Sequence, residues 1–370
     1  MHTDCKSLSS ILPKTSALIA EGIEADWHFG GQIAVVHQGR EVVDAGFGTS
    51  LPGEPVHRDD LTIWMSCTKP VSAAAFLLLV DEGQAGLDDP VHRFVPEFAQ
   101  KGKEGVSVRH LLTHTGGFRS ADLGWKPRPW DEAIRLVCEA PLEPRWEPGK
   151  SAGYHVDSSW YMLGEIVRRV TGVPFERFIR ERLLLPLGMT DCYVGIPPEL
   201  FPELEPRLVR LFNTTRQPPH EHGMFRDPAV AALCRPGGNG RGPARQLARF
   251  FELLLHPERQ SVLKPETVLS MRRRHREGLL DKSFRRVIDW GLGVIINSAR
   301  HNEGILPYGF GAKASVDTFG HGGNQSSSAL ADPAHDLVVV LVFNGQPGEE
   351  THQRRMHDAL TAVYDDLLLH

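Results

Sequence analysis

The most apolar stretch of the chain runs from Val71 to Val80 and is rich in Ala and Leu. A run of this length and composition predicts a buried helix, with Gly83 as its C-terminal stop. Pro70 is tolerated only in the first turn of a helix, so Ser66 should lie at or just inside the helix start. The hydrophobic pattern therefore places this serine against free backbone N–H groups and the positive end of a helix dipole.

Hydrophobic patterning elsewhere predicts strands at both ends of the chain and helices between them. The expected helices are 7–23, 158–171 with its stop at Gly172, and 350 to the end. The expected strands are 32–36 and 41–46 joined by a turn at 38–40, then 290–296, 326–331 and 337–343. This order predicts an α+β fold, an antiparallel sheet flanked by terminal helices with a large, mainly helical region inserted in it. We expect a discontinuous sheet domain of residues 1–65 and 285–370, a helical domain of residues 66–284, and an active site between them.

Composition and charge exclude several classes of partner and site. A net charge of −5 argues against nucleic acid or an anionic membrane surface as the main partner. The five cysteines are scattered without a C-x-x-C spacing, so we expect neither disulfides nor a metal site. The N-terminus lacks the features of a signal peptide, and no apolar run is long enough to span a membrane. The sequence predicts a cytoplasmic protein without a cofactor, and leaves its oligomeric state open.

Ser66 and Lys69 form the first candidate constellation. Three residues apart at a helix start, their side chains project from the same face. A serine hydroxyl is a poor nucleophile alone, but a buried lysine can lose its proton near neutral pH and act as its base. The same S-x-x-K spacing recurs at Ser261 and Lys264, where no buried helix begins at the serine, and we interpret that copy as chance.

Two further segments carry candidate chemistry. Tyr154 stands just before the helix expected at 158–171, where a tyrosine is usually a half-buried packing residue. Beside a lysine ammonium, however, its phenol would ionise more easily and could shuttle protons. The segment His321-Gly322-Gly323-Asn324 precedes an apolar strand, and its glycines would let a substrate approach the backbone. A simple turn before the strand is the alternative.

Three other motifs are interpreted as structural. Gly149 to Gly153 matches G-x-S-x-G, but the proline-rich segment before it cannot supply the buried strand of a nucleophile elbow. His110 and His114 have the spacing of a zinc motif without its glutamate, which favours a structural or capping role. The basic run Arg272–Arg274 with Arg276 is interpreted as a solvated helix face.

The three elements Ser66-x-x-Lys69, Tyr154-His155-Val156 and His321-Gly322-Gly323, in this order, resemble the serine β-lactamase and penicillin-binding-protein superfamily. The resemblance runs from about Gly30 to Phe343. It is carried also by the segments 87–91, 110–117 and 185–189. The chain is most similar to the class C β-lactamase-like carboxylesterases, often called family VIII.

This resemblance implies roles for individual residues. Ser66 would be the acylated nucleophile, Lys69 its proton acceptor and Tyr154 the second base. The backbone N–H groups of Ser66 and Asn324 would form the oxyanion hole. The strand motif His321-Gly322-Gly323 would take the place of Lys-Thr-Gly. With His155 and Val156, it would contact the substrate.

Two departures from the family pattern inform the substrate. Val156 stands where β-lactamases commonly carry an Asn that binds the substrate amide, and His321 stands where they carry a Lys that attracts a carboxylate. Both changes favour a small acyl ester over β-lactams and D-Ala-D-Ala peptides. Candidate walls of the pocket are aromatic: Trp125, Trp130, Trp160, Phe225 and Phe310.

The sequence thus predicts a serine hydrolase acting on small acyl esters. An acyltransferase of the same fold, working in small-molecule biosynthesis, is the first alternative. A β-lactamase or D-Ala peptidase is the second. A catalytically inactive binding protein on this scaffold is the alternative from a different class.

Overall fold

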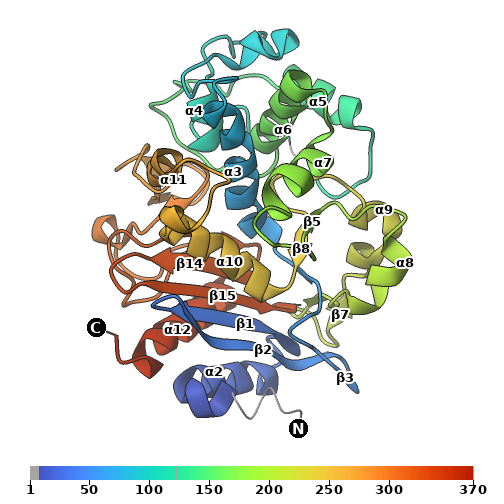
Figure 1. The fold of residues 1–370 in the computed structure, drawn as a ribbon, viewed down its shortest axis with the longest axis vertical. Coiled ribbons are helices and arrows are strands. Elements are labelled where there is room, and N and C mark those ends of the chain that lie inside the picture. Colours follow the sequence, from blue (N-terminus) through green and yellow to red (C-terminus); the bar gives the residue numbers. More distant parts are fainter. Residues whose placement is uncertain (1–7, 122, 370) are drawn as a thin grey trace.

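The computed structural model describes residues 8–121 and 123–369 of the chain. Its base is an eight-stranded sheet in the order β11-β12-β13-β14-β15-β1-β2-β3 (Figure 1). The longer strands are β1 (Gly30–His37), β2 (Arg40–Leu51), β13 (Phe319–Gly323), β14 (Ser327–Asp332) and β15 (Leu337–Phe343). Each neighbouring pair is antiparallel, and β15 joins the two ends of the chain by pairing with β1. The α+β fold and the hairpin expected at 32–46 are confirmed, and the strands expected at 326–331 and 337–343 also form an antiparallel pair.

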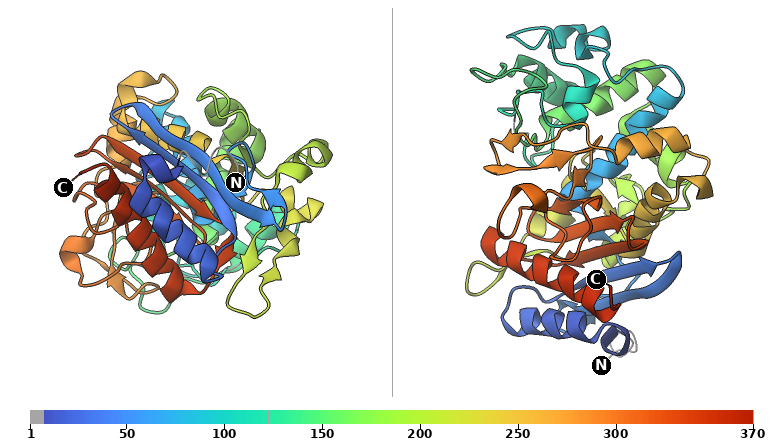
Figure 2. Two further views of the ribbon diagram at one scale, coloured as in Figure 1. Left: turned by 90° about the horizontal axis from the view of Figure 1, so that it is seen from below. Right: turned by 90° about the vertical axis from the view of Figure 1, so that its left-hand side faces the viewer.

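Both faces of the sheet are covered by helices, because successive side chains on each central strand point to opposite faces. In β15, Leu337, Val339 and Leu341 lie in the apolar cluster under α2 (Pro13–Glu24) and α12 (Glu349–Asp366). Val338, Val340 and Val342 belong to the cluster on the opposite face. That face is covered by α10 (Ala244–Leu255), which contacts β1, β14 and β15. Figure 2 shows α2 and α12 side by side beneath the sheet.

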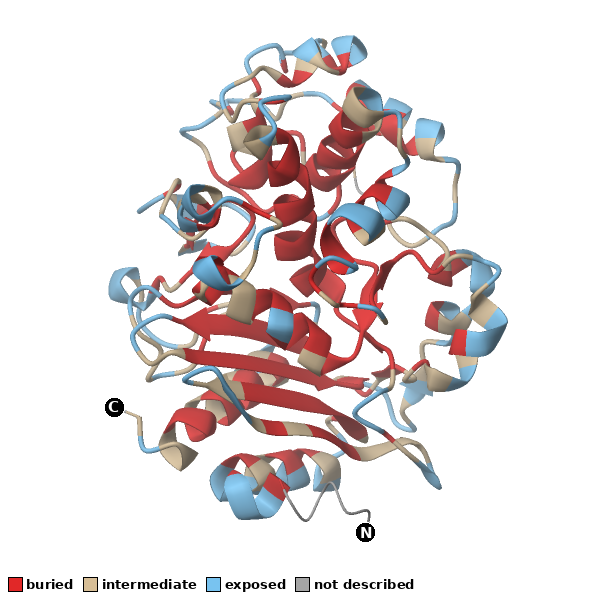
Figure 3. Ribbon diagram, viewed as in Figure 1, coloured by how far each residue is buried: buried red, intermediate tan, exposed pale blue. Residues whose placement is uncertain are grey.

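The helix predicted after Ser66 is α3 (Thr68–Asp81), and it runs through the centre of the region above the sheet (Figure 1). Twelve of its fourteen residues are buried, as expected for a helix that is apolar on all sides (Figure 3). It ends at Asp81 with Glu82 as its C-cap, and Gly83 follows with φ +70°. A short 3₁₀ turn, η1 (Met65–Cys67), precedes α3, so Ser66 is the middle residue of this turn, two residues before the start of α3.

The remaining helices surround α3 and extend over one end of the sheet (Figure 1). They are α4 (Val108–Leu112), α5 (Trp130–Glu139), α6 (Ser158–Thr171), α7 (Phe175–Ile179), α8 (Phe201–Leu204), α9 (Pro228–Ala231) and α11 (Pro265–Met271). Short strands tie these segments together: β4 (Thr62–Ile63), β5 (Tyr193–Val194), β6 (Phe212–Asn213), β7 (His220–Glu221), β8 (Gly240–Gly242), β9 (Leu280–Asp281), β10 (Arg286–Val287) and β16 (Gly345–Gln346). The division at residues 65/66 and 284/285 stays a prediction. Helix α10 belongs to the predicted helical domain of residues 66–284, yet it packs on the sheet.

Several predicted elements differ in detail. Of the N-terminal helix expected at 7–23, Ser7 lies outside the described residues. Residues 8–11 are helical, and α2 begins afresh at Pro13, since a proline fits the first turn of a helix but not its interior. The strand expected at 290–296 is two short strands, β11 (Asp289–Trp290) and β12 (Ile295–Ile296). The turn between them contains Gly293, whose φ is +77°.

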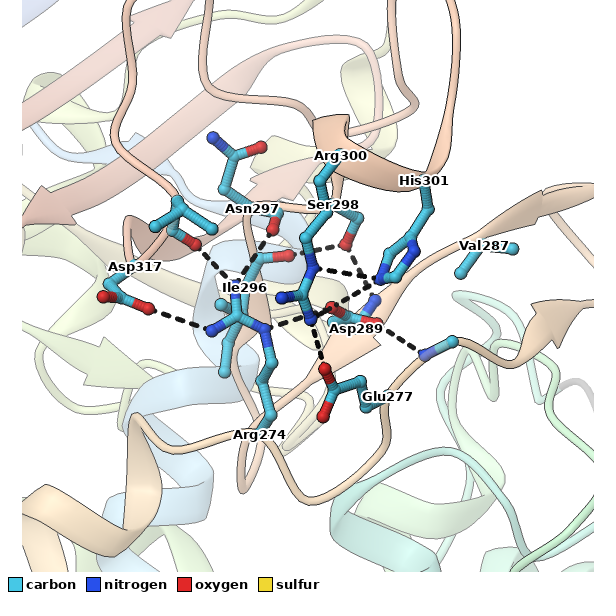
Figure 4. A network of polar contacts seen from close by, with 12 residues as sticks. Arg274, Glu277, Val287, Asp289, Ile296, Asn297, Ser298, Arg300, His301 and Asp317 are labelled. Carbon is cyan, nitrogen blue, oxygen red and sulfur yellow. Dashed lines mark hydrogen bonds and ion pairs between the residues drawn. The ribbon is translucent and has the colours of Figure 1, made fainter.

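The arginine run was wrongly predicted to be a solvated helix face. Arg274 bridges the buried carboxylate of Asp289, at 3.1 Å, and Asp317, at 2.9 Å (Figure 4). Arg276 is 2% exposed and pairs with Asp281 at 2.8 Å. These arginines follow α11 as loop residues, so the helical periodicity used to assign them to a surface does not apply.

Among the described residues, no helix is long and apolar enough to cross a membrane.

Candidate active site

Ser66 is held in a turn that its neighbours lock from both sides. Met65, directly before it, has φ +49°, a backbone conformation that a residue with a side chain adopts only under constraint. The hydroxyl of Thr68 donates to the carbonyl oxygen of Met65 at 2.6 Å and accepts from the backbone N–H of Gly240 at 2.8 Å. The backbone N–H of Trp64 also donates to the carbonyl oxygen of Gly240. The turn therefore presents the Ser66 side chain, 8% exposed, in one fixed orientation.

Lys69 lies one turn along α3 and is fully buried. Its Nζ is 3.1 Å from the Oγ of Ser66 and 2.6 Å from the carbonyl oxygen of Gly237. Burial lowers the pKa of Lys69 to about 7, since the charged form loses its hydration. A neutral amine can donate one N–H to Gly237 and accept the Ser66 proton with its lone pair. The structure thus brings these two residues together as the sequence predicted.

Tyr154 lies against the same lysine, with the Lys69 Nζ 5.0 Å from the centre of its ring. Its phenolic oxygen is buried and has no hydrogen-bond partner of good geometry among the described residues. Burial raises the pKa of Tyr154, and the nearby Ser66 hydroxyl offsets this rise only in part. The expectation of an easily ionised phenol was wrong, because burial of the phenol itself disfavours its charged form. Tyr154 is therefore an uncharged phenol at neutral pH, and its catalytic role stays a prediction.

The motif His321-Gly322-Gly323 forms the strand β13 itself, next to the nucleophile, and is not a turn. The carbonyl oxygen of His321 accepts a 2.9 Å hydrogen bond from the Sγ of Cys67. Gly323 allows this close approach, since a β-carbon there would lie 2.5 Å from the carbonyl oxygen of Trp64. Sheet and helix therefore meet directly at Ser66.

The His321 ring is buried and uncharged. Burial, followed by the charge of Lys69, lowers the pKa of His321 to about 3. Its Nδ1 lies 2.6 Å from the carbonyl oxygen of Gly322 and donates to it, while Nε2 has no partner among the described residues. A fixed positive charge is therefore missing at this point of the strand.

Tyr308 fills the space beside Gly322. A β-carbon on Gly322 would lie 2.2 Å from the Tyr308 ring. The ring centre of Tyr308 is 5.6 Å from that of His321 and 6.2 Å from that of Tyr154. Phe284 packs edge-on against Tyr308 at 5.6 Å. The sequence analysis missed Tyr308, which lies in a loop without any periodic pattern.

The turn after β13 carries Asn324, and its backbone is tied to the segment that leads into α12. The side chain of Gln346 donates to the carbonyl oxygen of Asn324 at 2.7 Å, and Arg355 donates to that of Gln325 at 3.0 Å. These bonds hold the turn near the start of α3. The backbone N–H groups of Ser66 and Asn324 as an oxyanion hole stay a prediction.

The two residues after Tyr154 have different surroundings. His155 is fully buried, and its Nε2 accepts from the backbone N–H of Gly117 at 3.0 Å while Nδ1 bonds the carbonyl oxygen of Gly153. Both ring nitrogens are thus occupied by the protein backbone, and the structure does not bring this ring into contact with a substrate. Val156 is 45% exposed, so its side chain is open to solvent. It remains a candidate contact for the substrate.

The aromatic residues proposed as pocket walls separate into groups. Trp125 and Phe225 pack edge to face at 4.8 Å in the apolar cluster that also contains Met65, beside the nucleophile. Trp160 packs against Lys69, whose Nζ is 5.6 Å from its ring centre. Trp130 packs on Tyr161, and Phe310 lies in the cluster on the α2–α12 side of the sheet. The first group and Trp160 therefore lie near the nucleophile, through Met65 and Lys69 respectively.

The other motifs are structural. His110 caps α4, accepting from the Ser107 N–H at 3.2 Å, and His114 is buried and accepts from the His155 N–H. Ser151 lies in a turn that no strand precedes. No cluster of metal-binding side chains occurs among residues 8–121 and 123–369.

Asp157 and Arg235 are further residues that the sequence analysis missed. They form an ion pair of 2.7 Å, and both side chains are buried within the walls around Lys69. One feature of the sequence could have drawn attention to Asp157. It directly precedes the helix expected at 158–171, and Asp is a favoured residue at the N-cap of a helix. Nothing in the sequence connects it to Arg235.

Comparison with known proteins agrees with this geometry. The family model described as Beta-lactamase matches residues 15–363. Esterase EstB of Burkholderia gladioli is 29% identical over 346 residues, which cover 85% of this chain and 86% of EstB. The crystal structure of a family VIII carboxylesterase superimposes with a TM-score of 0.75 at 25% identity, covering 94% of this chain and 96% of that one. The structure of EstCE1, described as a hydrolase with promiscuous acyltransferase activity, has a TM-score of 0.77 at 20% identity, covering 96% and 99%.

Proposed function

Since this chain belongs to the beta-lactamase family and is a serine hydrolase, we propose that it cleaves small acyl esters through an acyl-enzyme on Ser66. The observation that carries the proposal is the buried contact of 3.1 Å between Lys69 Nζ and Ser66 Oγ. The lowered pKa of Lys69, about 7, makes this amine a usable base at neutral pH.

In the acylation step, Lys69 takes the proton of Ser66 while Oγ attacks the ester carbonyl carbon. The negative charge that develops on the carbonyl oxygen is stabilised by the backbone N–H groups of Ser66 and Asn324. The tetrahedral intermediate then expels the alcohol, which takes the proton held by Lys69, either directly or through the hydroxyl of Tyr154. Water attacks the acyl-enzyme in the second step and gives its proton to Lys69 by the same route. This proton returns to Ser66 Oγ as the acid leaves.

The surroundings of β13 favour esters over β-lactams. The buried and neutral His321 offers no fixed charge to a substrate carboxylate, and Val156 offers no amide to a substrate side chain. An ester needs neither contact, and its alkoxide leaves without the full protonation that an amine requires. The apolar wall of Met65, Phe225 and Trp125 suits a short, uncharged acyl group.

Acyl transfer is the second candidate. It uses the same acyl-enzyme, with an alcohol or amine in place of water, and EstCE1 carries a description of this kind on the same fold. The partially apolar surroundings of Ser66 favour it, because they reduce access of water to the acyl-enzyme.

The decisive test is intact-mass detection of adducts after exposure to 4-nitrophenyl acetate, a β-lactam and a fluorophosphonate. We expect acetyl and phosphonyl adducts on the wild-type protein and none on Ser66→Ala. Partition of the acetyl group between water and added alcohols then separates hydrolysis from transfer. A wild-type protein that forms no adduct would make the inactive binding protein the better interpretation.

A further inference from the structure

A buried ion pair stands behind the catalytic lysine. Asp157, 1% exposed, accepts a 2.7 Å hydrogen bond from Arg235, which is 6% exposed. The guanidinium of Arg235 also stacks on the ring of Trp125, at 4.2 Å. Burying two charges costs more hydration energy than their attraction usually returns, so such a pair is weak evidence for a stabilising role. A role in function is the better explanation.

The backbone around Arg235 connects the pair to Lys69. The carbonyl oxygen of Arg235 accepts from the N–H groups of Gly238 and Asn239, both at 3.0 Å, which closes a tight turn. Gly237, inside this turn, provides the carbonyl oxygen that Lys69 Nζ bonds at 2.6 Å. Ser72 of α3 fixes the other side of the turn, because its hydroxyl donates to the carbonyl oxygen of Pro236 at 2.6 Å. Any movement of Arg235 therefore moves the partner of the lysine.

The pair also acts on the lysine through charge. After burial, the carboxylate of Asp157 is the largest influence on the pKa of Lys69 and raises it, while Arg235 lowers it. Cys67 contributes a smaller rise. The remaining titratable groups nearby are uncharged at neutral pH, because burial raises the pKa of Tyr154 and lowers those of His114 and His321.

We propose that Arg235 is a positioning residue that cancels the charge of Asp157 next to Lys69 and seats the Gly237 carbonyl against it. The resting enzyme then holds Lys69 as the free amine that accepts the Ser66 proton. Asp157 in turn prevents Arg235 from being a lone buried cation, which would oppose the protonation of Lys69 when Ser66 gives up its proton. This inference rests on the proposed function, since it assigns the residues that set the base.

The test is the pH dependence of the acylation burst with 4-nitrophenyl acetate for the wild type, Arg235→Met, Asp157→Asn and the double variant. In Arg235→Met the unpaired carboxylate of Asp157 favours the ammonium form of Lys69. The step at which the acylation rate rises with pH should therefore move to higher pH by about one unit or more. In Asp157→Asn the unpaired guanidinium should move the step to lower pH by a similar amount. The double variant should return close to the wild-type step.

Two control variants separate charge from packing. Arg235→Lys keeps the positive charge and should leave the step near its wild-type position. Arg274→Met breaks the buried Arg274–Asp289 pair shown in Figure 4, whose charges are not among the influences on Lys69, and should leave the step unmoved. If Arg235→Met does not fold, the downward shift in Asp157→Asn still tests the proposal.

Unchanged steps in the folded variants, or shifts of Arg235→Met and Asp157→Asn in the same direction, would overturn the inference. Such variants would still form an adduct on Ser66, so the proposed function would stand. Loss of the adduct in the wild type would instead count against the proposed function itself.

Discussion

The Nζ of Lys69 and the Oγ of Ser66 lie 3.1 Å apart in a site where both side chains are buried. A serine and a lysine at this spacing can exchange one proton without a histidine, provided that the amine is uncharged. The pKa of Lys69, about 7, meets this condition over the neutral and alkaline range.

Replacing the nucleophile should abolish turnover. We expect Ser66→Ala to lower kcat by at least about three orders of magnitude, because no other hydroxyl shares the turn before α3. Ser151→Ala and Ser261→Ala serve as matched controls and should retain wild-type rates. Steady-state hydrolysis of a chromogenic ester measures all three, and a normal rate for Ser66→Ala would refute the assignment.

Activity should depend on the protonation of Lys69. The base form is the neutral amine, so kcat/KM should be low in acid, rise as the pH passes through about 7, and level off above it. A rate–pH profile with an uncharged ester measures this step. A profile that falls with rising pH over the same range would mean that the protonated lysine is the active form.

Lys69→Arg should be as inactive as Lys69→Ala. A guanidinium keeps its proton at any pH that the enzyme survives, so it cannot accept the proton of Ser66. Burst amplitude and rate on the same ester compare the two variants. Recovery of activity in Lys69→Arg would show that a positive charge at this position, and not a base, is required.

Tyr154→Phe should keep the fold and lose rate. The ring would still pack between His114 and Phe284, and the lost hydroxyl has no hydrogen-bond partner in the described structure. We expect both acylation and deacylation to slow by about 10²–10⁴-fold, the usual contribution of a positioned proton donor. Pre-steady-state burst kinetics separate the two steps, and thermal unfolding checks the fold. Full activity would require another proton carrier.

Substrate preference should follow the missing polar contacts. We expect kcat/KM for a short-chain aryl ester to exceed that for nitrocefin by at least about two orders of magnitude. Parallel assays on the same protein preparation measure the ratio. Comparable rates would mean that neither Val156 nor the neutral His321 limits β-lactam binding.

The sequence predicted those features that depend on local pattern. The buried helix after Ser66, the helix 158–171 and the strands 326–331 and 337–343 follow from periodicity and stop signals, and all occur with shifts of at most three residues. The pairing of Ser66 with Lys69 follows from their spacing on a helix, whereas the place of Tyr154 beside them was an implication of the family resemblance.

Features made by distant segments were not predictable in this way. Asp157 and Arg235 are 78 positions apart in the sequence, and no local pattern around either residue predicts that they form an ion pair. His155 was assigned to the substrate site by the family resemblance alone, as the middle residue of the motif Tyr154-His155-Val156. In the structure its ring points to the backbone of Gly117. The arginines after α11 were misassigned because their buried carboxylate partners come from separate strands and loops.

The contact between Tyr308 and Gly322 bears on how this scaffold can change its substrate over evolutionary time. Restoring a Lys-Thr-Gly strand motif needs a side chain at position 322, yet the Tyr308 ring already occupies that space, 2.2 Å from where the β-carbon would be. Gly322→Thr alone should therefore be harmful, and it becomes acceptable only after Tyr308 has been replaced by a smaller residue. The order of the two mutations decides whether the path is open, which is sign epistasis. A path from this sequence to a Lys-Thr-Gly motif therefore needs a substitution at Tyr308 as well as those at His321 and Gly322, and it needs the Tyr308 substitution before Gly322→Thr.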